Sequence, residues 1–368
     1  MNLTKDAYEY LMNFAEDRDI LNMLSVNKKF RDDSFFERVL RRKYPLLLKF
    51  KEENETFKHL YLRMIRYIAK LQEEFGIPYI SNPIFNPQNF YKNNRFDKLI
   101  YQFAGNIAVE IGNQKLVDLM IEKGAKLNTL LYNAAKAGHL NLVRHLIDKG
   151  ARNIERGLEG AAEGGHMNLI NFFLNNGAED YDGAMGAAAK GGHNNIVDYF
   201  IEKGANAFNY AMFEAARGGN LDMVQYMMNK GANNFDRALI SAAMGGNIDI
   251  ILFLIGQGAT NLDFALTFAA GAGKLKAIDV LIEKGATDFQ GAMEMAAEFG
   301  RINIVKYFLE KAPLSRERAF LLAASNGKLN VVKYLRDLGA SNIQEAINIA
   351  EANGHYPVVE YLKSVFRK

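Results

Sequence analysis

The sequence predicts an all-α fold, a curved solenoid of stacked helix pairs that follows a separate helical head. The first observation is a glycine that recurs at a fixed interval of 27 residues, or 26 at the first step. It stands at Gly112, Gly138, Gly165, Gly192, Gly219, Gly246, Gly273, Gly300, Gly327 and Gly354. The second is that each of the ten units carries two short segments with helical spacing of apolar residues. The third is the absence of cysteine beside 49% hydrophobic residues, which permits a large core and excludes disulfides and thiolate chemistry.

The unit at residues 208–230 shows the expected helix pair. Its first helix covers 208–217 and buries a face made of Ala211, Met212, Ala215 and Ala216. Its second covers 221–230 and buries Leu221, Val224, Met227 and Met228, with Met223 beside them. Gly219 between the helices and Gly231 after the second suit the left-handed backbone of helix ends.

Polar side chains are expected to cap the first helix of each unit. They are Asn209 and its equivalents Asp182, Asp236 and Asp263. Such side chains accept hydrogen bonds from the free N–H groups of a first helical turn. The apolar residues before them, Tyr181, Phe208, Phe235, Leu262 and Phe289, are expected to act as hydrophobic staples.

Paired alanines keep the first helix of each unit slim. The pairs are Ala161–Ala162, Ala188–Ala189, Ala215–Ala216, Ala242–Ala243, Ala269–Ala270, Ala296–Ala297 and Ala323–Ala324. A larger side chain there would force neighbouring units apart. The alanine pairs therefore predict close stacking.

The pattern AAxxGHxxxVxxLxxxGA resembles the second half of the ankyrin repeat, ten times over residues 97–368. The usual ankyrin unit has about 33 residues and carries TPLH before the alanines. That tetrapeptide and the segment that forms the projecting hairpin are missing here, so little or no strand is expected. The array is similar to the short-loop ankyrin arrays of large DNA viruses. The resemblance implies a protein–protein interaction module.

The head covers residues 1–50. Over residues 3–45 it resembles an F-box, and from Leu11 to Pro45 it reads LMNFAEDRDILNMLSVNKKFRDDSFFERVLRRKYP. In that family, apolar positions dock on the adaptor of cullin–RING ubiquitin ligases. The matching residues are Leu3, Leu11, Phe14, Ile20, Leu24, Val26 and Phe30. The alternative is that they form the core of the head itself. Thr4 and Asp6 replace the proline and glutamate of the family pattern.

Residues 51–96 are expected to connect the head to the array. A helix comes first, and a segment with three of the six prolines and several aromatic residues follows it. So many aromatic residues indicate a segment that packs onto the first repeat and covers its apolar face.

No catalytic, metal or cofactor site is predicted. His139, His166 and His193 recur once per unit at the turn, where a ring is expected to bond to neighbouring backbone. Units stack roughly 8–10 Å apart, whereas zinc ligands lie about 2 Å from one ion. The glycine pairs at Gly164–Gly165, Gly191–Gly192 and Gly218–Gly219 lack a phosphate-loop pattern and are expected at helix ends.

The position after each alanine pair is expected to be free of packing and to contact a partner. It reads Lys136, Glu163, Lys190, Arg217, Met244, Gly271, Glu298 and Ser325, and Tyr210 and Phe213 flank it. We predict partner binding on the concave face by Lys136, Glu163, Lys190, Tyr210, Phe213, Arg217 and Met244. The alternative for each residue is a solvated helix face.

The charge balance and the length of the apolar runs exclude some classes of partner and of cellular location. The 45 basic and 42 acidic residues are interleaved and the net charge is only +3, so no nucleic acid is expected. No apolar run approaches membrane-spanning length and MNLTKDAYEY lacks a signal-peptide pattern, so a cytoplasmic protein is expected, in the host cytoplasm if the protein is viral. The protein is also expected to be a monomer. The resemblance implies a viral adaptor that binds a host protein and presents it to a ubiquitin ligase. The alternative, which Thr4 favours, is a scaffold or decoy without ligase recruitment.

Overall fold

The computed structural model describes residues 105–366, apart from residues 107, 111, 113, 123 and 313. The head and the connecting segment lie outside these residues, and with them the F-box-like positions. Within the described part every regular element is a helix and no strand is present. The expectation of an all-α solenoid is therefore confirmed.

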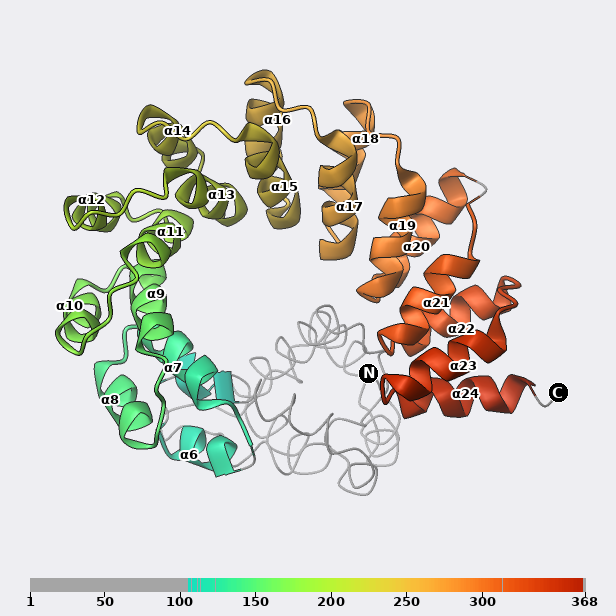
Figure 1. The fold of residues 1–368 in the computed structure, drawn as a ribbon, viewed down its shortest axis with the longest axis horizontal. Coiled ribbons are helices and arrows are strands. Elements are labelled where there is room, and N and C mark those ends of the chain that lie inside the picture. Colours follow the sequence, from blue (N-terminus) through green and yellow to red (C-terminus); the bar gives the residue numbers. More distant parts are fainter. Residues whose placement is uncertain are drawn as a thin grey trace, which may run out of the picture. The chain divides into compact units, whose positions relative to one another are not determined.

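Two layers of helices make up the array. The inner helices are α7 (Leu127–Lys136), α9 (Ile154–Gly164), α11 (Tyr181–Gly191), α13 (Phe208–Gly218), α15 (Phe235–Gly245), α17 (Leu262–Ala272), α19 (Phe289–Glu298), α21 (Glu317–Ser325) and α23 (Ile343–Ala352). The outer helices are α6 (Gln114–Glu122), α8 (Leu140–Asp148), α10 (Met167–Asn175), α12 (Asn194–Glu202), α14 (Leu221–Asn229), α16 (Ile248–Gly256), α18 (Leu275–Glu283), α20 (Ile302–Lys311), α22 (Leu329–Asp337) and α24 (Tyr356–Phe366). From α9 to α18 the odd-numbered helices lie on the inside of the curve and the even-numbered ones on the outside (Figure 1).

The core follows the predicted faces closely. In α13 the residues Ala211, Met212, Ala215 and Ala216 are fully buried, and every paired alanine named above is also at 0% exposure. In α14 the buried residues are Met223, Val224 and Met227, whereas Leu221 and Met228 are half-buried. The slim inner helix and the apolar outer helix together form one continuous core between units.

Glycines end the helices as expected. Gly219 follows α13 with φ of 89°, and Gly231 follows α14 with φ of 105°, a region that residues with a Cβ rarely adopt. After α13 the backbone N–H groups of Gly219 and Asn220 both bond to the carbonyl of Ala215. The turn between the two helices of a unit is therefore closed by the backbone itself.

The residues expected to cap the inner helices have a different role. Asn209 is the second residue of α13, and its side-chain oxygen accepts the backbone N–H groups of Asn233 and Asn234 at 2.9 and 3.0 Å. Those two residues belong to the turn of the next unit. The capping expectation is therefore wrong for Asn209, Asp182, Asp236 and Asp263, because each side chain points along the array and not into its own helix.

We call these contacts junction clamps, because each one ties an inner helix to the turn that leads into the following inner helix. The clamp residues, 27 positions apart, are Asn128, Glu155, Asp182, Asn209, Asp236, Asp263, Gln290 and Glu317. Every one accepts a backbone N–H 24 or 25 residues further along the chain, and all but Gln290 accept a pair.

True caps lie two residues before the clamp residues. Asn153, Asp180, Asn234 and Asp288 accept the backbone N–H of the residue three positions later. The aromatic residues expected as staples are instead the first residues of their helices. Tyr181 stacks on Phe200 with ring centroids 6.3 Å apart, and Phe289 packs on Phe308 at 5.9 Å, so these rings join the two helices of one unit.

Removing one clamp should weaken the array measurably. For Asp236→Ala we expect a loss of about 1–2 kcal/mol in the free energy of unfolding, because the N–H groups of Thr260 and Asn261 lose a charged acceptor. Urea denaturation followed by circular dichroism measures it. Asp249→Ala, on the exposed side of α16, is the control and should change the value by a few tenths of a kcal/mol. Equal effects in the two variants would contradict a clamping role.

The unit with Gly354 departs from the alanine pattern. Glu351 occupies the second position of the alanine pair, is exposed, and forms an ion pair with Lys363 at 3.2 Å. The seven earlier units with a named alanine pair bury an alanine at this position, whereas Glu351 is solvent-accessible. Pro357 is the second residue of α24, where its missing N–H costs no helical bond.

Candidate functional site

Each inner helix leaves one face uncovered. In α13 the uncovered residues are Tyr210, Phe213, Glu214 and Arg217, opposite the buried alanine face. Equivalent positions recur in the other inner helices, which from α9 to α17 lie on the inside of the curve (Figure 1). This inner face is the surface on which sequence reasoning placed partner binding.

The predicted site residues all lie on the inner face but differ in exposure. Lys136 and Arg217 are exposed, Tyr210 is 43% exposed, and Lys190, Phe213 and Met244 are half-buried. Glu163 is 8% exposed and thus buried. The structure brings Glu163, Lys190, Tyr210 and Arg217 together around one pocket, whereas Phe213 and Met244 lie outside its lining.

The expectation that the position after each alanine pair is free of packing is wrong at two places. Glu163 is held by Lys136 and Lys190, whose Nζ atoms lie 2.6 and 2.9 Å from Oε1. Gly271 is buried, and a Cβ there would lie 2.8 Å from Cγ of Met295. These positions therefore carry contacts between units as well as surface.

Glu163 is the centre of a polar cluster that spans three inner helices. Its second carboxylate oxygen accepts a hydrogen bond from the Tyr132 hydroxyl of α7, and the two lysines come from α7 and α11. Burial alone would raise the pKa of Glu163, but the bonds from Lys136, Tyr132 and Lys190 together hold that pKa below its ordinary value. Burial, and then the bond to Glu163, raises the pKa of Tyr132. The carboxylate is therefore charged at neutral pH.

This cluster predicts acid-sensitive stability. A carboxylate with a lowered pKa stabilises the fold above its unfolded pKa, and the stabilisation is lost as pH falls through the folded value. Glu163→Gln should lose about 1–2 kcal/mol at pH 7. The difference from the native chain should shrink below the ordinary glutamate pKa. Urea denaturation from pH 7 down to pH 3 measures this, and a difference that is constant with pH would contradict it.

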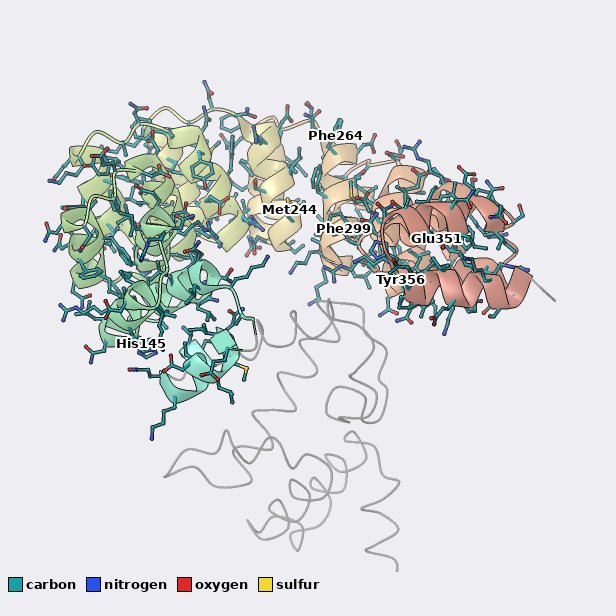
Figure 2. All side chains as sticks on the ribbon, turned by 60° about the horizontal axis from the view of Figure 1, so that its bottom comes forward. His145, Met244, Phe264, Phe299, Glu351 and Tyr356 are labelled. Carbon is teal, nitrogen blue, oxygen red and sulfur yellow. The ribbon has the colours of Figure 1, made fainter. Side chains whose placement is uncertain are left out.

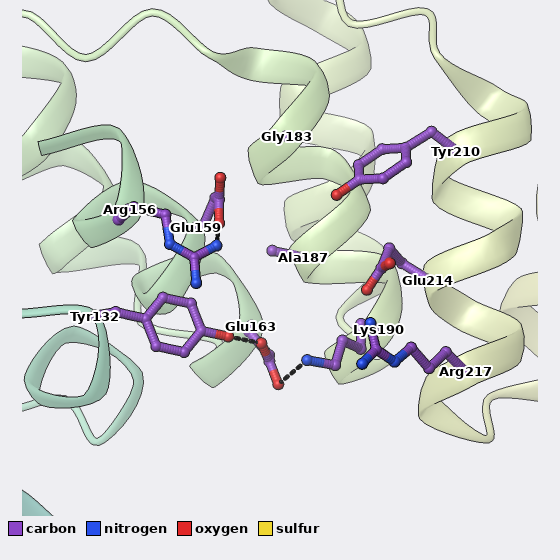
Figure 3. Close-up of a pocket in the computed structure, with 10 residues that line it drawn as sticks. All are labelled: Tyr132, Arg156, Glu159, Glu163, Gly183, Ala187, Lys190, Tyr210, Glu214 and Arg217. Carbon is purple, nitrogen blue, oxygen red and sulfur yellow. Dashed lines mark hydrogen bonds and ion pairs between the residues drawn. The ribbon is translucent and has the colours of Figure 1, made fainter. Parts of the chain in front are cut away.

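The pocket has a volume of about 280 Å³ and lies across four inner helices, α7, α9, α11 and α13 (Figure 3). Its lining consists of Tyr132, Arg156, Glu159, Glu163, Gly183, Ala187, Lys190, Tyr210, Glu214 and Arg217. Figure 3 shows Gly183 and Ala187 of α11 between the side chains of α9 on one side and those of α13 on the other. The pocket is thus a gap in the row of side chains on the inner face.

Two glycines cause this gap. In α9, α15 and α21 an arginine near the start of the helix reaches back to a residue of the preceding unit. Arg156 lies over the Tyr132 ring at 4.6 Å, Arg237 over the Phe213 ring at 5.4 Å, and Arg318 pairs with Glu294 at 3.1 Å. The equivalent residue of α11 is Gly183, which leaves Glu159 uncovered.

Gly186 provides the second missing side chain. A Cβ on Gly186 would lie 2.4 Å from Cε1 of Tyr210, so the Tyr210 ring sits against the bare backbone of α11. Sequence reasoning found Tyr210 but not the pocket. The available signal was that α11 alone has glycine at both of these positions.

An aromatic patch, which we define as Phe264, Phe268 and Phe299, lies on the central units. These residues are 61%, 36% and 49% exposed. Phe264 and Phe268 belong to α17 and Phe299 follows α19; Figure 2 labels Phe264 and Phe299. The Phe299 ring lies 3.4 Å from a Cβ built on Gly271 of α17. These three are the phenylalanines of the described residues that are 36% exposed or more, and they lie on two neighbouring units as apolar surface.

The histidines have the structural role that was expected. Nε2 of His139, His166 and His193 donates to the backbone carbonyls of Glu110, Lys136 and Glu163, at 3.2, 3.0 and 3.1 Å. Asn220 and Asn247 take the same position in the next units, and their side-chain amides donate to Lys190 and Arg217. Among the described residues, no group of three His, Asp or Glu side chains could hold a metal ion.

No described helix combines the length and the apolar composition needed to span a membrane.

A family model of ankyrin repeats, which represents three copies, matches the chain at residues 158–238, 184–264, 239–318 and 293–365. No curated protein sequence matches it. Among solved structures, the crystal structure of the human ASB11 ankyrin repeat domain is similar, with 24% identity over 43% of this chain and 84% of that one and a TM-score of 0.30.

Proposed function

Because this chain belongs to the ankyrin-repeat family, we propose that it recognises a protein partner along the inner face of its array. Ankyrin repeats are protein–protein interaction modules, typically without catalytic activity. Stacked repeats create an extended concave surface on which another protein can lie. The residues that we expect to contact it are Lys136, Glu163, Lys190, Tyr210, Phe213, Arg217 and Met244, together with the aromatic patch.

The observation that carries this proposal is the aromatic patch. Keeping apolar surface in water costs about 25 cal/mol per Å² compared with burying it. Phe264 is 61% exposed on a helix whose other face is fully buried, so most of its surface stays in contact with water. Large apolar patches and aromatic anchors are typical of protein-binding surfaces.

Removing the patch should abolish binding without unfolding the chain. For the double variant Phe264→Ser and Phe268→Ser we expect at least a tenfold loss of captured partner, because two central aromatic contacts disappear. The measurement is affinity capture from cytosol, quantified by mass spectrometry. The matched control is Leu252→Ser with Leu275→Ser, two leucines on outer helices that are 40% and 44% exposed. Equal recovery by both double variants would contradict binding on the inner face.

The proposal extends to the head through its F-box-like sequence. We expect Leu3, Leu11, Phe14, Ile20, Leu24, Val26 and Phe30 to dock on the adaptor of a cullin–RING ubiquitin ligase. The chain would then act as a viral adaptor in the host cytoplasm, with the array holding a host protein for ubiquitin transfer. The resemblance in sequence is what supports this part of the proposal.

The alternative is a scaffold or decoy that sequesters its partner. Thr4, at the place of the family's proline, favours it. Affinity capture separates the two, because an adaptor recovers a cullin together with the array's partner. Recovery of the partner with no cullin or ligase adaptor would contradict ligase recruitment.

A further inference from the structure

We propose that the pocket between α9, α11 and α13 receives a basic side chain, a lysine or an arginine, of the protein that the array binds. The inference rests on the proposed function, since it names one feature of the partner. It follows from which charged groups around the pocket are already paired and which are not.

Most cations of the lining are occupied within the fold. Lys190 pairs with Glu163, which Lys136 also contacts. Arg156 pairs with Glu159 and lies over the Tyr132 ring. An incoming acid would have to compete with these carboxylates.

Glu214 is the carboxylate that remains available. It lines the pocket from α13 and has no hydrogen bond or ion pair to any described residue. Figure 3 shows it on the same side of the pocket as Tyr210, one helical turn further along α13. A partner's ammonium or guanidinium group between the two would meet a charge and an aromatic ring together.

The surroundings of Tyr210 are acidic. Burial raises the pKa of its hydroxyl first, and the carboxylates of Glu214, Glu159 and Asp180 raise it further, whereas Arg156 lowers it. Among the charged groups that act on Tyr210, the carboxylates therefore outnumber the cations. Arg217 is exposed, and Figure 3 shows its side chain near Lys190, on the side of Glu214 that faces away from Tyr210.

Size and shape fit one side chain. A volume of about 280 Å³ is just below the range of roughly 300–1,000 Å³ typical for pockets that hold a whole small molecule. Tyr210 is 43% exposed, and its opposite edge rests on α11 at Gly186. The ring is thus held against α11, while 43% of the residue remains exposed to a partner.

Panning a displayed library of random 16-residue peptides on the full chain tests the inference. We expect selected peptides to share a lysine or arginine at one aligned position, and its replacement by alanine to weaken binding at least tenfold. Selection on Glu214→Lys should lose this preference. Glu202→Lys makes the same charge change on the exposed side of α12 and should keep it.

A second variant tests the pocket without removing its acid. Gly183→Arg introduces the residue that three other inner helices carry at this place, Arg156, Arg237 and Arg318, and its side chain should fill the gap beside Glu159. Peptides with the basic residue should then bind at least tenfold more weakly, with unchanged circular dichroism.

The outcomes separate the two proposals. Peptides that lack a shared basic residue and bind Glu214→Lys as well as the native chain would overturn the pocket inference and leave the proposed function standing. Failure of the native chain to enrich any peptide over a surface without protein would overturn the proposed function, and the pocket inference with it.

Discussion

Gly160→Val is expected to lower the free energy of unfolding by about 3 kcal/mol or more, the largest effect of any single change considered. A Cβ on Gly160 would lie 2.3 Å from the carbonyl oxygen of Tyr132, a backbone atom of the neighbouring helix α7. Backbone cannot turn away as a side chain can. The substitution must therefore separate α7 from α9 and expose the fully buried Leu130 and Leu131.

Hydrogen exchange shows where this effect falls. Helices α7 and α8 should lose protection in Gly160→Val, whereas α17 to α24 should keep theirs, because each unit contacts only its neighbours. The matched control is Ser241→Val, which places a valine at the equivalent position of α15, and we expect it to change the free energy of unfolding by no more than about 0.5 kcal/mol. Uniform loss of protection, or equal effects at both sites, would contradict a local clash.

Ala216→Leu is the second large effect, with an expected loss of about 1–3 kcal/mol. Ala216 is at 0% exposure on the buried face of α13, and three more carbon atoms there have no space unless the neighbouring inner helices move apart. Thermal denaturation followed by circular dichroism measures the change in melting temperature.

The control for this prediction is the next residue. Arg217 is exposed on the inner face, so Arg217→Leu should leave the melting temperature within about one or two degrees. An unchanged melting temperature in Ala216→Leu would show that this alanine does not lie where units pack.

Sequence reasoning located the helices because the repeat supplies the same information many times. The residue spacing around Gly219 alone defines a helix end only to within one or two residues. Comparison with the equivalent residues of neighbouring units defines that end more closely. Helices α13 and α14 end within one residue of their expected ends. The buried alanine pairs were predictable for the same reason.

The junction clamps were missed because two roles use the same residue types. Asp182 and Asp180 lie two residues apart at the start of α11, and either carboxylate suits an N-terminal cap. The donors to Asp182 are Asn206 and Ala207, 24 and 25 residues away. Only the distance between stacked units brings them close, and a sequence does not state that distance.

The pocket was missed because it consists of absent side chains. A pattern search looks for residues that carry chemistry, whereas here Gly183 and Gly186 matter through what they lack. Their effect appears only once Tyr210 and Glu159 are known to lie on either side. Four of the ten residues that line the pocket were nevertheless among the predicted site residues, namely Glu163, Lys190, Tyr210 and Arg217.

The junction clamps also bear on how such a chain can change its length. Each clamp residue meets the same kind of turn at the same offset, so Asp182 could bond to Asn233 and Asn234 as it now bonds to Asn206 and Ala207. A duplication or deletion of 27 residues at any point then joins two ends that already match. The number of units is free to grow or shrink through gene recombination, while the identity of each inner face, and hence of what it recognises, is carried unit by unit.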